Sequence, residues 1–144
     1  MDEWKYVKRQ ERRAKTVKSP RILAELSRDK NYEIRTKVAW NLNTPVETLV
    51  ELSRDKHYSV RSGVALNRNT PPETLAELSR DQNYWVPKYV AQHRNTPVNT
   101  LAELSLDQDE YVSSIVAKNP KWKRLKEAGI LDQAITASKY LGIL

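Results

Sequence analysis

Apolar residues recur along most of the chain with a period of about 26 residues, which is the pattern of a tandem-repeat protein. Four segments align without gaps through their shared part, and they begin at residues 19, 44, 70 and 96. The prolines near their starts lie 25, 26 and 26 residues apart: Pro20, Pro45, Pro71 and Pro97. Each segment holds one apolar pair at i, i+3 and a second at i, i+4, so we predict two short amphipathic helices per repeat.

The first helix of each repeat, helix A, is predicted to begin at a Ser-Pro or Thr-Pro pair, because Pro is favoured at the first helical position and a hydroxyl can cap free N–H groups. Thr44 with Glu47 and Thr70 with Glu73 have the spacing of a capping box. The helix is about two turns long, so part of it could be 3₁₀. Its apolar pairs are Leu23/Leu26, Leu49/Leu52, Leu75/Leu78 and Leu101/Leu104.

The second helix, helix B, is predicted to start after an Asp whose side chain bonds the next turn of backbone. These residues are Asp29, Asp55, Asp81 and Asp107. The apolar pairs of helix B are Ile34/Val38, Val60/Val64, Val86/Val90 and Val112/Val116, and each is followed by a small Ala. A polar residue closes each helix B, and we interpret Asn41, Asn67, His93 and Asn119 as a structural ladder that bonds backbone carbonyls.

Charges repeat with the same period. Arg35 and Arg61, with Asp29 and Asp55, are expected to form a ladder of ion pairs between layers. A catalytic carboxylate is the alternative, and recurrence of the Asp in every repeat favours a structural role.

The fold class is therefore predicted to be all-α, a solenoid of four repeats over residues 19–119, because helices this short need the apolar rows of their neighbours. Residues 1–18 are expected to form a basic N-terminal cap helix with Trp4, Val7, Ala14 and Val17 on one side. Residues 120–144 are expected to form C-terminal cap helices. One runs from Asn119-Pro120 to Glu127 and stops at Ala128-Gly129, and Asp132 caps the last, which carries Ile135, Tyr140 and Leu141. We expect residues 1–144 to be a single domain.

The motif Thr-Pro-x-x-x-Leu-x-x-Leu-Ser-x-Asp, followed by Val-Arg-x-x-Val-Ala and Asn-x-Asn, resembles the leucine-rich repeat variant family over residues 19–119. It is clearest in residues 44–69: Thr44, Pro45, Leu49, Leu52, Asp55, Val60, Arg61, Val64, Ala65, Asn67 and Asn69. The resemblance implies a right-handed superhelix of alternating α- and 3₁₀-helices, similar to armadillo arrays. Pro87 and Ser113 replace the Arg in the later repeats. A family member binds iron–sulfur through a Cys-rich cluster, and that role does not carry over because this chain has no Cys.

The row of helix B that faces away from the core is where the repeats differ most. Its members have i, i+4, i+7 spacing, which places each set on one helical face. In repeats three and four this row carries large apolar side chains, which is typical of a partner-binding patch. Packing of the same side chains under a cap or against the next repeat is an equally favoured interpretation. The predicted partner-binding residues are Trp40, Leu66, Trp85, Tyr89, Tyr111 and Ile115. We therefore expect a non-enzymatic protein-interaction scaffold whose partner is a protein.

The net charge of +7 is confined to the two ends. Residues 1–18 carry seven basic and three acidic residues, residues 19–118 carry thirteen of each, and residues 119–144 carry five basic and two acidic. Nucleic-acid binding through these basic ends is the alternative function. The competing interpretation is that these charges are simply the solvated outer face of the cap helices, which favours solubility. The candidate residues are Lys5, Lys8, Arg9, Arg12, Arg13, Lys121, Lys123 and Arg124.

A tyrosine recurs at one position of the first three repeats: Tyr32, Tyr58 and Tyr84. Packing of these rings under the turn between helix A and helix B is favoured over a ladder on which nucleic-acid bases stack.

Other chemistry has little support in the sequence. His57 and His93 occupy different repeat positions, and the acidic group at 107–110 lacks the spacing of a calcium loop, so no metal and no cofactor is expected. No phosphate loop or nucleophile motif is present, and an enzyme of the helical-repeat DNA glycosylase type is the least favoured interpretation.

No apolar h-region of a signal peptide and no apolar segment of membrane-spanning length is present, so we expect a cytoplasmic protein with no membrane contact. The oligomeric state does not follow from the sequence.

Overall fold

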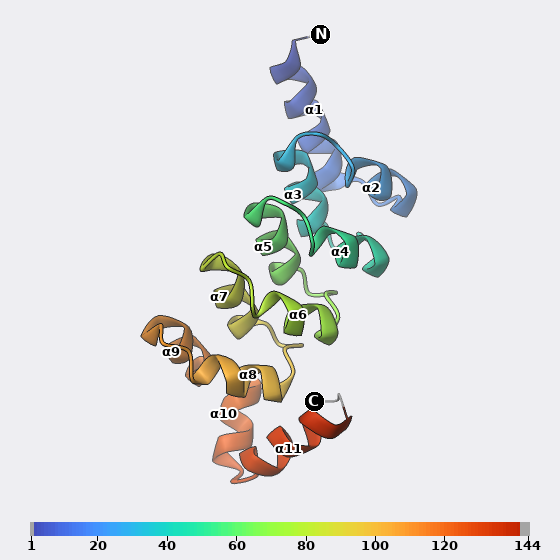
Figure 1. Ribbon diagram of the computed structural model, residues 1–144. Helices are drawn as coiled ribbons and strands as arrows, with labels where there is room; N and C mark the ends of the chain where they lie inside the picture. Colours follow the sequence, from blue (N-terminus) through green and yellow to red (C-terminus); the bar gives the residue numbers. More distant parts are fainter. Residues whose placement is uncertain (1, 142–144) are drawn as a thin grey trace. The chain divides into compact units, whose positions relative to one another are not determined.

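The computed structural model describes residues 2–141 and has α-helices and no strand in that range (Figure 1). The all-helical fold class is thereby confirmed. The chain divides into two compact units, residues 1–70 and residues 71–144. The expectation of a single domain stays a prediction, and the parts of the predicted caps at residues 1 and 142–144 lie outside the described residues.

Unit 1 holds the N-terminal cap and the first two repeats. Its helices are α1 (Glu3–Thr16), α2 (Pro20–Leu26), α3 (Tyr32–Trp40), α4 (Val46–Leu52) and α5 (Tyr58–Leu66). The B helices α3 and α5 pack side by side, and α1 packs on the other side of α3. The A helices α2 and α4 form the second row (Figure 1).

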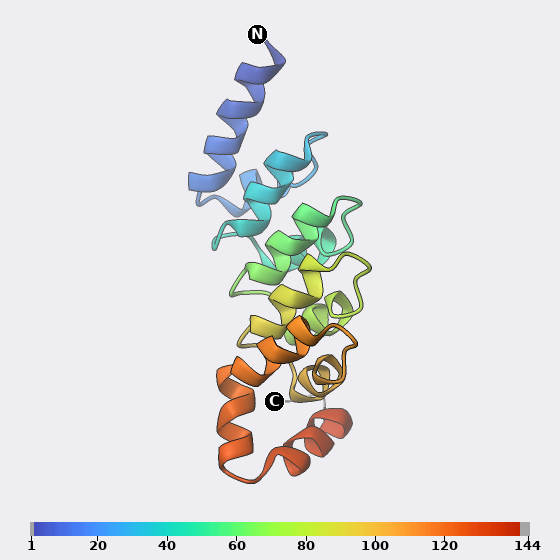
Figure 2. The same ribbon diagram turned by 90° about the vertical axis from the view of Figure 1, so that its left-hand side faces the viewer.

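Unit 2 holds the last two repeats and the C-terminal cap. Its helices are α6 (Pro72–Leu78), α7 (Trp85–Gln92), α8 (Val98–Ser105), α9 (Glu110–Lys118), α10 (Pro120–Glu127) and α11 (Leu131–Leu141). The B helices α7 and α9 pack together, and α10 leads away from α9 so that α11 returns against α8 (Figure 2).

The predicted core is confirmed in every repeat. All eight leucines of the A helices and all eight aliphatic residues of the B helices are buried, at 7% exposure or less. Burying an aliphatic side chain stabilises the fold by about 1.5–3 kcal/mol, so these two rows are the main source of packing energy in each unit.

Helix B starts through two consecutive side-chain-to-backbone turns, which confirms the role predicted for the recurring Asp. In the first repeat the Asp29 carboxylate accepts the N–H of Asn31 at 2.9 Å, and the Asn31 side chain accepts the N–H of Glu33 at 2.7 Å. The same pair of bonds begins the other three B helices, where His57, Asn83 and Asp109 take the place of Asn31. Because these groups accept N–H groups that have no partner inside the helix, they fix where each helix B starts.

The predicted capping boxes at the start of helix A are wrong. The hydroxyl of Thr44 donates to the carbonyl of Val38 at 2.6 Å, and the hydroxyl of Thr70 donates to that of Val64 at the same distance. These threonines therefore satisfy the end of the preceding helix B, and Pro45 and Pro71 are the cap residues of helices that begin one residue later. Only in the first repeat is the recurring proline, Pro20, itself the first residue of helix A.

Both helices of each repeat are α-helices, so the alternation with 3₁₀-helices that the resemblance implied is not observed. A tighter i→i−3 pattern occurs at helix ends: after helix A the N–H of Arg28 donates to the carbonyl of Glu25, and after helix B the N–H of Asn41 donates to that of Val38.

Both predicted ladders are confirmed within the units. The side-chain amide of Asn67 donates to the carbonyls of Ala39 and Asn41 in the previous repeat, at 2.7 and 3.0 Å. Asn41 makes the same kind of bonds to the cap helix, and Asn119 makes them to the third repeat. In the charge ladder, the Arg35 guanidinium binds the Asp55 carboxylate through two hydrogen bonds, at 2.6 and 3.0 Å.

The caps are formed as predicted in outline, with three differences. Val7 and Ala14 of α1 are buried, but Trp4 is 67% exposed, so it does not belong to the packed side. Asn119, Pro120 and Gly129, which has φ of 70°, delimit α10 as expected. The last helix begins at Leu131, so Asp132 lies in its first turn and is not its cap. This helix packs through Ala134 and Ser138, and Tyr140 and Leu141 are exposed, because the helix presents its small residues to α8.

Candidate partner-binding face of the B helices

The predicted row of unit 2 lies on the outer side of α7 and α9. Trp85 is 44% exposed and Tyr111 is 50% exposed, and Tyr89 is half-buried. These side chains are left outside because the aliphatic pairs of the same helices take the core side. Ile115 differs from the others, since it is only 7% exposed and packs as part of the floor beneath them.

The aromatic rings of this face contact one another. The ring of Trp85 stacks on that of Tyr89 at a centroid distance of 6.4 Å, and Tyr84 stacks on Tyr111 at 6.3 Å. Tyr84 also meets Trp85 edge to face at 5.5 Å. Such ring pairs contribute energy beyond that of their buried area, and the three contacts join the four rings into one continuous cluster.

A lysine lies in the middle of this cluster. The Nζ atom of Lys88 is 4.3 Å from the ring centroid of Trp85, 5.1 Å from that of Tyr111 and 5.8 Å from that of Tyr89. All three distances are within the range of cation–π attraction. Lys88 is not among the residues predicted from the sequence, although its position between Trp85 and Tyr89 on one helix was a usable signal.

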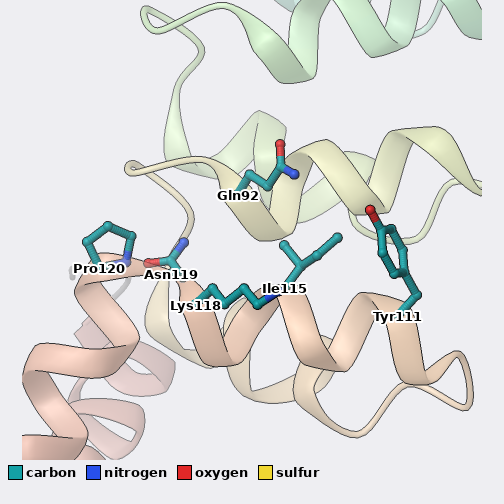
Figure 3. Close-up of a pocket in the computed structure, with 6 residues that line it drawn as sticks. All are labelled: Gln92, Tyr111, Ile115, Lys118, Asn119 and Pro120. Carbon is teal, nitrogen blue, oxygen red and sulfur yellow. The ribbon is translucent and has the colours of Figure 1, made fainter.

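Next to the cluster is a hollow of about 220 Å³ (Figure 3). It is lined by Gln92 from α7 and by Tyr111, Ile115 and Lys118 from α9. Asn119 and Pro120 close its end. The hollow thus combines an apolar floor with a cationic and an amide group at its edge.

The outer row of the B helices in unit 1 also combines exposed apolar side chains with a lysine, but it has fewer aromatic rings than that of unit 2. Trp40 is 49% exposed and Leu66 is 44% exposed. The Lys37 Nζ lies 4.5 Å above the Trp40 ring. The ring rests on Gly63, where an added Cβ would come within 2.9 Å of the Trp40 Cδ1 atom. A hollow beside it is lined by Lys15, Lys37, Trp40, Asn41, Leu42 and Asn43.

The three recurring tyrosines do not pack beneath the turns, as we had favoured. Tyr32, Tyr58 and Tyr84 are each about two-fifths exposed. In unit 1 the ring of Tyr32 stacks on His57 at 3.7 Å, and His57 stacks on Tyr58 at 5.2 Å. Tyr32 and Tyr58 are the first residues of their B helices, and Tyr84 immediately precedes α7.

The basic residues of the N-terminal cap are largely solvated. Lys5 pairs with Asp2 at 3.5 Å, and Lys8 pairs with Glu11 at 2.9 Å, where the hydrogen bond that the ammonium donates to the carboxylate raises the pKa of Lys8. The remaining predicted residues, Arg9, Arg12 and Arg13, are exposed.

The C-terminal basic cluster is not a uniform surface. The Nζ of Lys121 turns inward and donates to the carbonyl of Thr96 at 2.9 Å. Burial and the nearby charge of Arg124 lower the pKa of Lys121. Lys123 and Arg124 are exposed. The structure therefore gives Lys121 a packing role instead of the phosphate-binding role that its sequence position predicted.

Residues 2–141 offer neither a metal site nor a membrane span. No group of three or more His, Cys, Asp and Glu side chains in this range could hold a metal ion. Within the same residues, no helix has the length and apolarity needed to cross a membrane.

The fold and the ladders define the class of this chain as a helical-repeat protein. The family model described as leucine rich repeat variant matches residues 58–83, which is one repeat length, and supports the family indicated by the motif. Repeats of this family form scaffolds that are typically used in protein interaction and are typically not enzymes. Neither a curated protein nor a solved structure matches the chain.

Proposed function

We propose that this chain is a non-enzymatic scaffold that binds a partner protein on the outer face of its B helices, centred on Trp85, Tyr89 and Tyr111. The observation that carries the proposal is the ordered, half-exposed aromatic cluster beside a hollow in unit 2. Half-exposed Trp and Tyr side chains next to a pocket are the residues that most often dominate binding energy in interfaces. Trp40 and Leu66 in unit 1 are the corresponding residues of a secondary contact.

Affinity capture with matched tryptophan variants tests this function. The full chain, Trp85→Ala and Trp4→Ala are used as baits in a lysate of the encoding organism, and the captured proteins are quantified by mass spectrometry. Trp4 is an even more exposed tryptophan on α1, outside the proposed face, so it controls for non-specific stickiness. We expect a protein that the full chain and Trp4→Ala retain and that Trp85→Ala loses at least about tenfold, a change of about 1.4 kcal/mol. Identical captured sets for all three folded baits contradict the proposal.

Nucleic-acid binding is the second candidate, and the exposure of Arg9, Arg12 and Arg13 on one cap helix is the observation that favours it. Titration with mixed single-stranded and duplex DNA at two salt concentrations tests it. Affinity that falls steeply with salt and with Arg→Gln changes at these positions would support the second candidate. Absence of binding at low salt would rule it out.

A further inference from the structure

The outer face of unit 2 has cations that its own carboxylates do not neutralise. Within residues 2–141, no carboxylate lies within ion-pair distance of Lys88 or Lys118. The Asp109 carboxylate is engaged with the N–H of Tyr111, and Glu110 lies in the first turn of α9. The acidic groups of this face are therefore confined to the start of α9, and the lysines occupy the middle and the far end.

The ammonium of Lys88 is held in place before any partner binds. Three rings surround it at 4.3 to 5.8 Å, whereas an ordinary surface lysine samples many rotamers. An anion that pairs with a fixed ammonium costs less side-chain entropy than one that must immobilise a free lysine. Lys88 is thus suited to pair with a carboxylate from outside.

The hollow beside Lys118 suits the backbone and one apolar side chain of an extended segment. Ile115 and Tyr111 provide an apolar floor. The exposed side-chain amide of Gln92 has no hydrogen-bond partner in the part of the chain that the structure describes. An amide of this kind can donate to and accept from a peptide group.

We propose that the occupant of this face is an extended acidic segment of the partner protein, which places an apolar side chain in the hollow and carboxylates against Lys88 and Lys118. This inference rests on the proposed function and names the chemistry of its partner. Charge complementarity of this kind sets specificity and register. A single-stranded nucleic acid is disfavoured, because bases need free ring faces for stacking and the Lys88 ammonium already lies over the rings of this cluster.

Selection from a phage-displayed library of random dodecapeptides on the full chain tests the inference. We expect the enriched peptides to carry a net negative charge and at least one large apolar residue. A synthetic copy of an enriched peptide should bind Lys88→Glu at least about tenfold more weakly than the wild type, and it should bind Lys56→Glu unchanged. Lys56 is the matched control because it is exposed in a turn of unit 1. Replacing the acids of the peptide with lysine should restore binding to Lys88→Glu, an outcome that a general loss of structure cannot produce.

The remaining outcomes separate this inference from the proposed function. Enriched peptides that lack acids but lose binding in Tyr111→Ala overturn the acidic partner and leave the proposed function intact. Recovery of no peptide above a protein-free control, or of peptides that bind Tyr111→Ala as well as wild type, overturns the inference. DNA binding that is lost in both Lys88→Glu and Tyr111→Ala also overturns it. Lys118→Glu replaces Lys88→Glu if circular dichroism shows that the latter does not fold.

Discussion

A single buried amide links the second repeat to the first, and another links the fourth repeat to the third. Asn67 is 2% exposed, and its side chain bonds two carbonyls of the previous repeat and accepts the N–H of Asn69. Recurrence of a polar residue at this position, an Asn in three of the four repeats, made the role predictable from the sequence. The fate of Thr44 was not predictable in the same way, because its hydroxyl can serve the helix before it or the helix after it, and only the backbone path decides between them.

Gly63 lies where helices α3 and α5 come too close together for a larger side chain. A Cβ there would lie 2.9 Å from the Cβ of Ala39, a fully buried atom fixed to the backbone of α3. We expect Gly63→Ala to lower the free energy of unfolding by about 1–3 kcal/mol, because overpacking of α3 against α5 outweighs the gain of about 1 kcal/mol in helix propensity. Urea unfolding followed by circular dichroism measures this, with Ser59→Ala on the same helix as control. A variant more stable than wild type would show that α3 can move away without loss.

The Arg35–Asp55 pair makes stability depend on pH. Burial raises the pKa of Asp55, but the hydrogen bonds from Arg35 and from the N–H of His57 together bring the pKa below its ordinary value. A carboxyl whose pKa is lowered in the folded state stabilises the fold above its unfolded pKa, and that stability is lost as pH falls through the folded pKa. Asp55→Asn retains an oxygen for the His57 N–H and removes the charge.

We therefore expect Asp55→Asn to cost about 3 kcal/mol at neutral pH, as for a broken buried ion pair. The difference from wild type should shrink as the pH is lowered from about 5 toward 2. Urea unfolding at a series of pH values measures it, and Glu47→Gln, at an exposed carboxylate, should show no such trend. A difference that stays constant with pH would mean that the Asp55 charge contributes nothing.

At the scale of elements, the B helices carry both the core and the candidate face. Their i, i+4 aliphatic pairs were predictable because the same spacing recurs four times. The contacts of Lys88 with three rings were not, since they depend on side-chain directions on two separate helices. The burial of Ile115, which is 7% exposed, was missed for a related reason, because it depends on how α9 packs against the helices around it.

The cap helix α1 substitutes for a helix B at the start of unit 1. Its residue Ala14 is fully buried against α3, and the carbonyl of Ala14 accepts the amide of Asn41 at 2.8 Å. We expect Ala14→Asp to lower the free energy of unfolding by about 3 kcal/mol or more, because an unpaired carboxylate would be buried. Arg12→Asp, on the exposed side of α1, should change stability by less than about 0.5 kcal/mol. Equal stabilities of the two variants in urea would mean that α1 is not docked on α3.

At the scale of the whole molecule, the chain is a helical-repeat protein whose net charge is confined to its ends and whose two compact units each present a lysine-covered tryptophan on the B helices. Sequence periodicity was sufficient for the number and order of the repeats, because each repeat needs its neighbours to bury its apolar rows. It was not sufficient for the partner, because binding depends on the few positions at which the repeats differ.

Photo-crosslinking from the proposed face tests the central claim most directly. Tyr111→p-benzoylphenylalanine places a photoreactive group beside the hollow, and the same replacement at Tyr140, which is 85% exposed on α11, is the control. After irradiation in cells, we predict a covalent adduct with a distinct partner protein from position 111 that is absent from position 140. The account is contradicted if position 111 gives no protein adduct, or only the adducts that position 140 also gives.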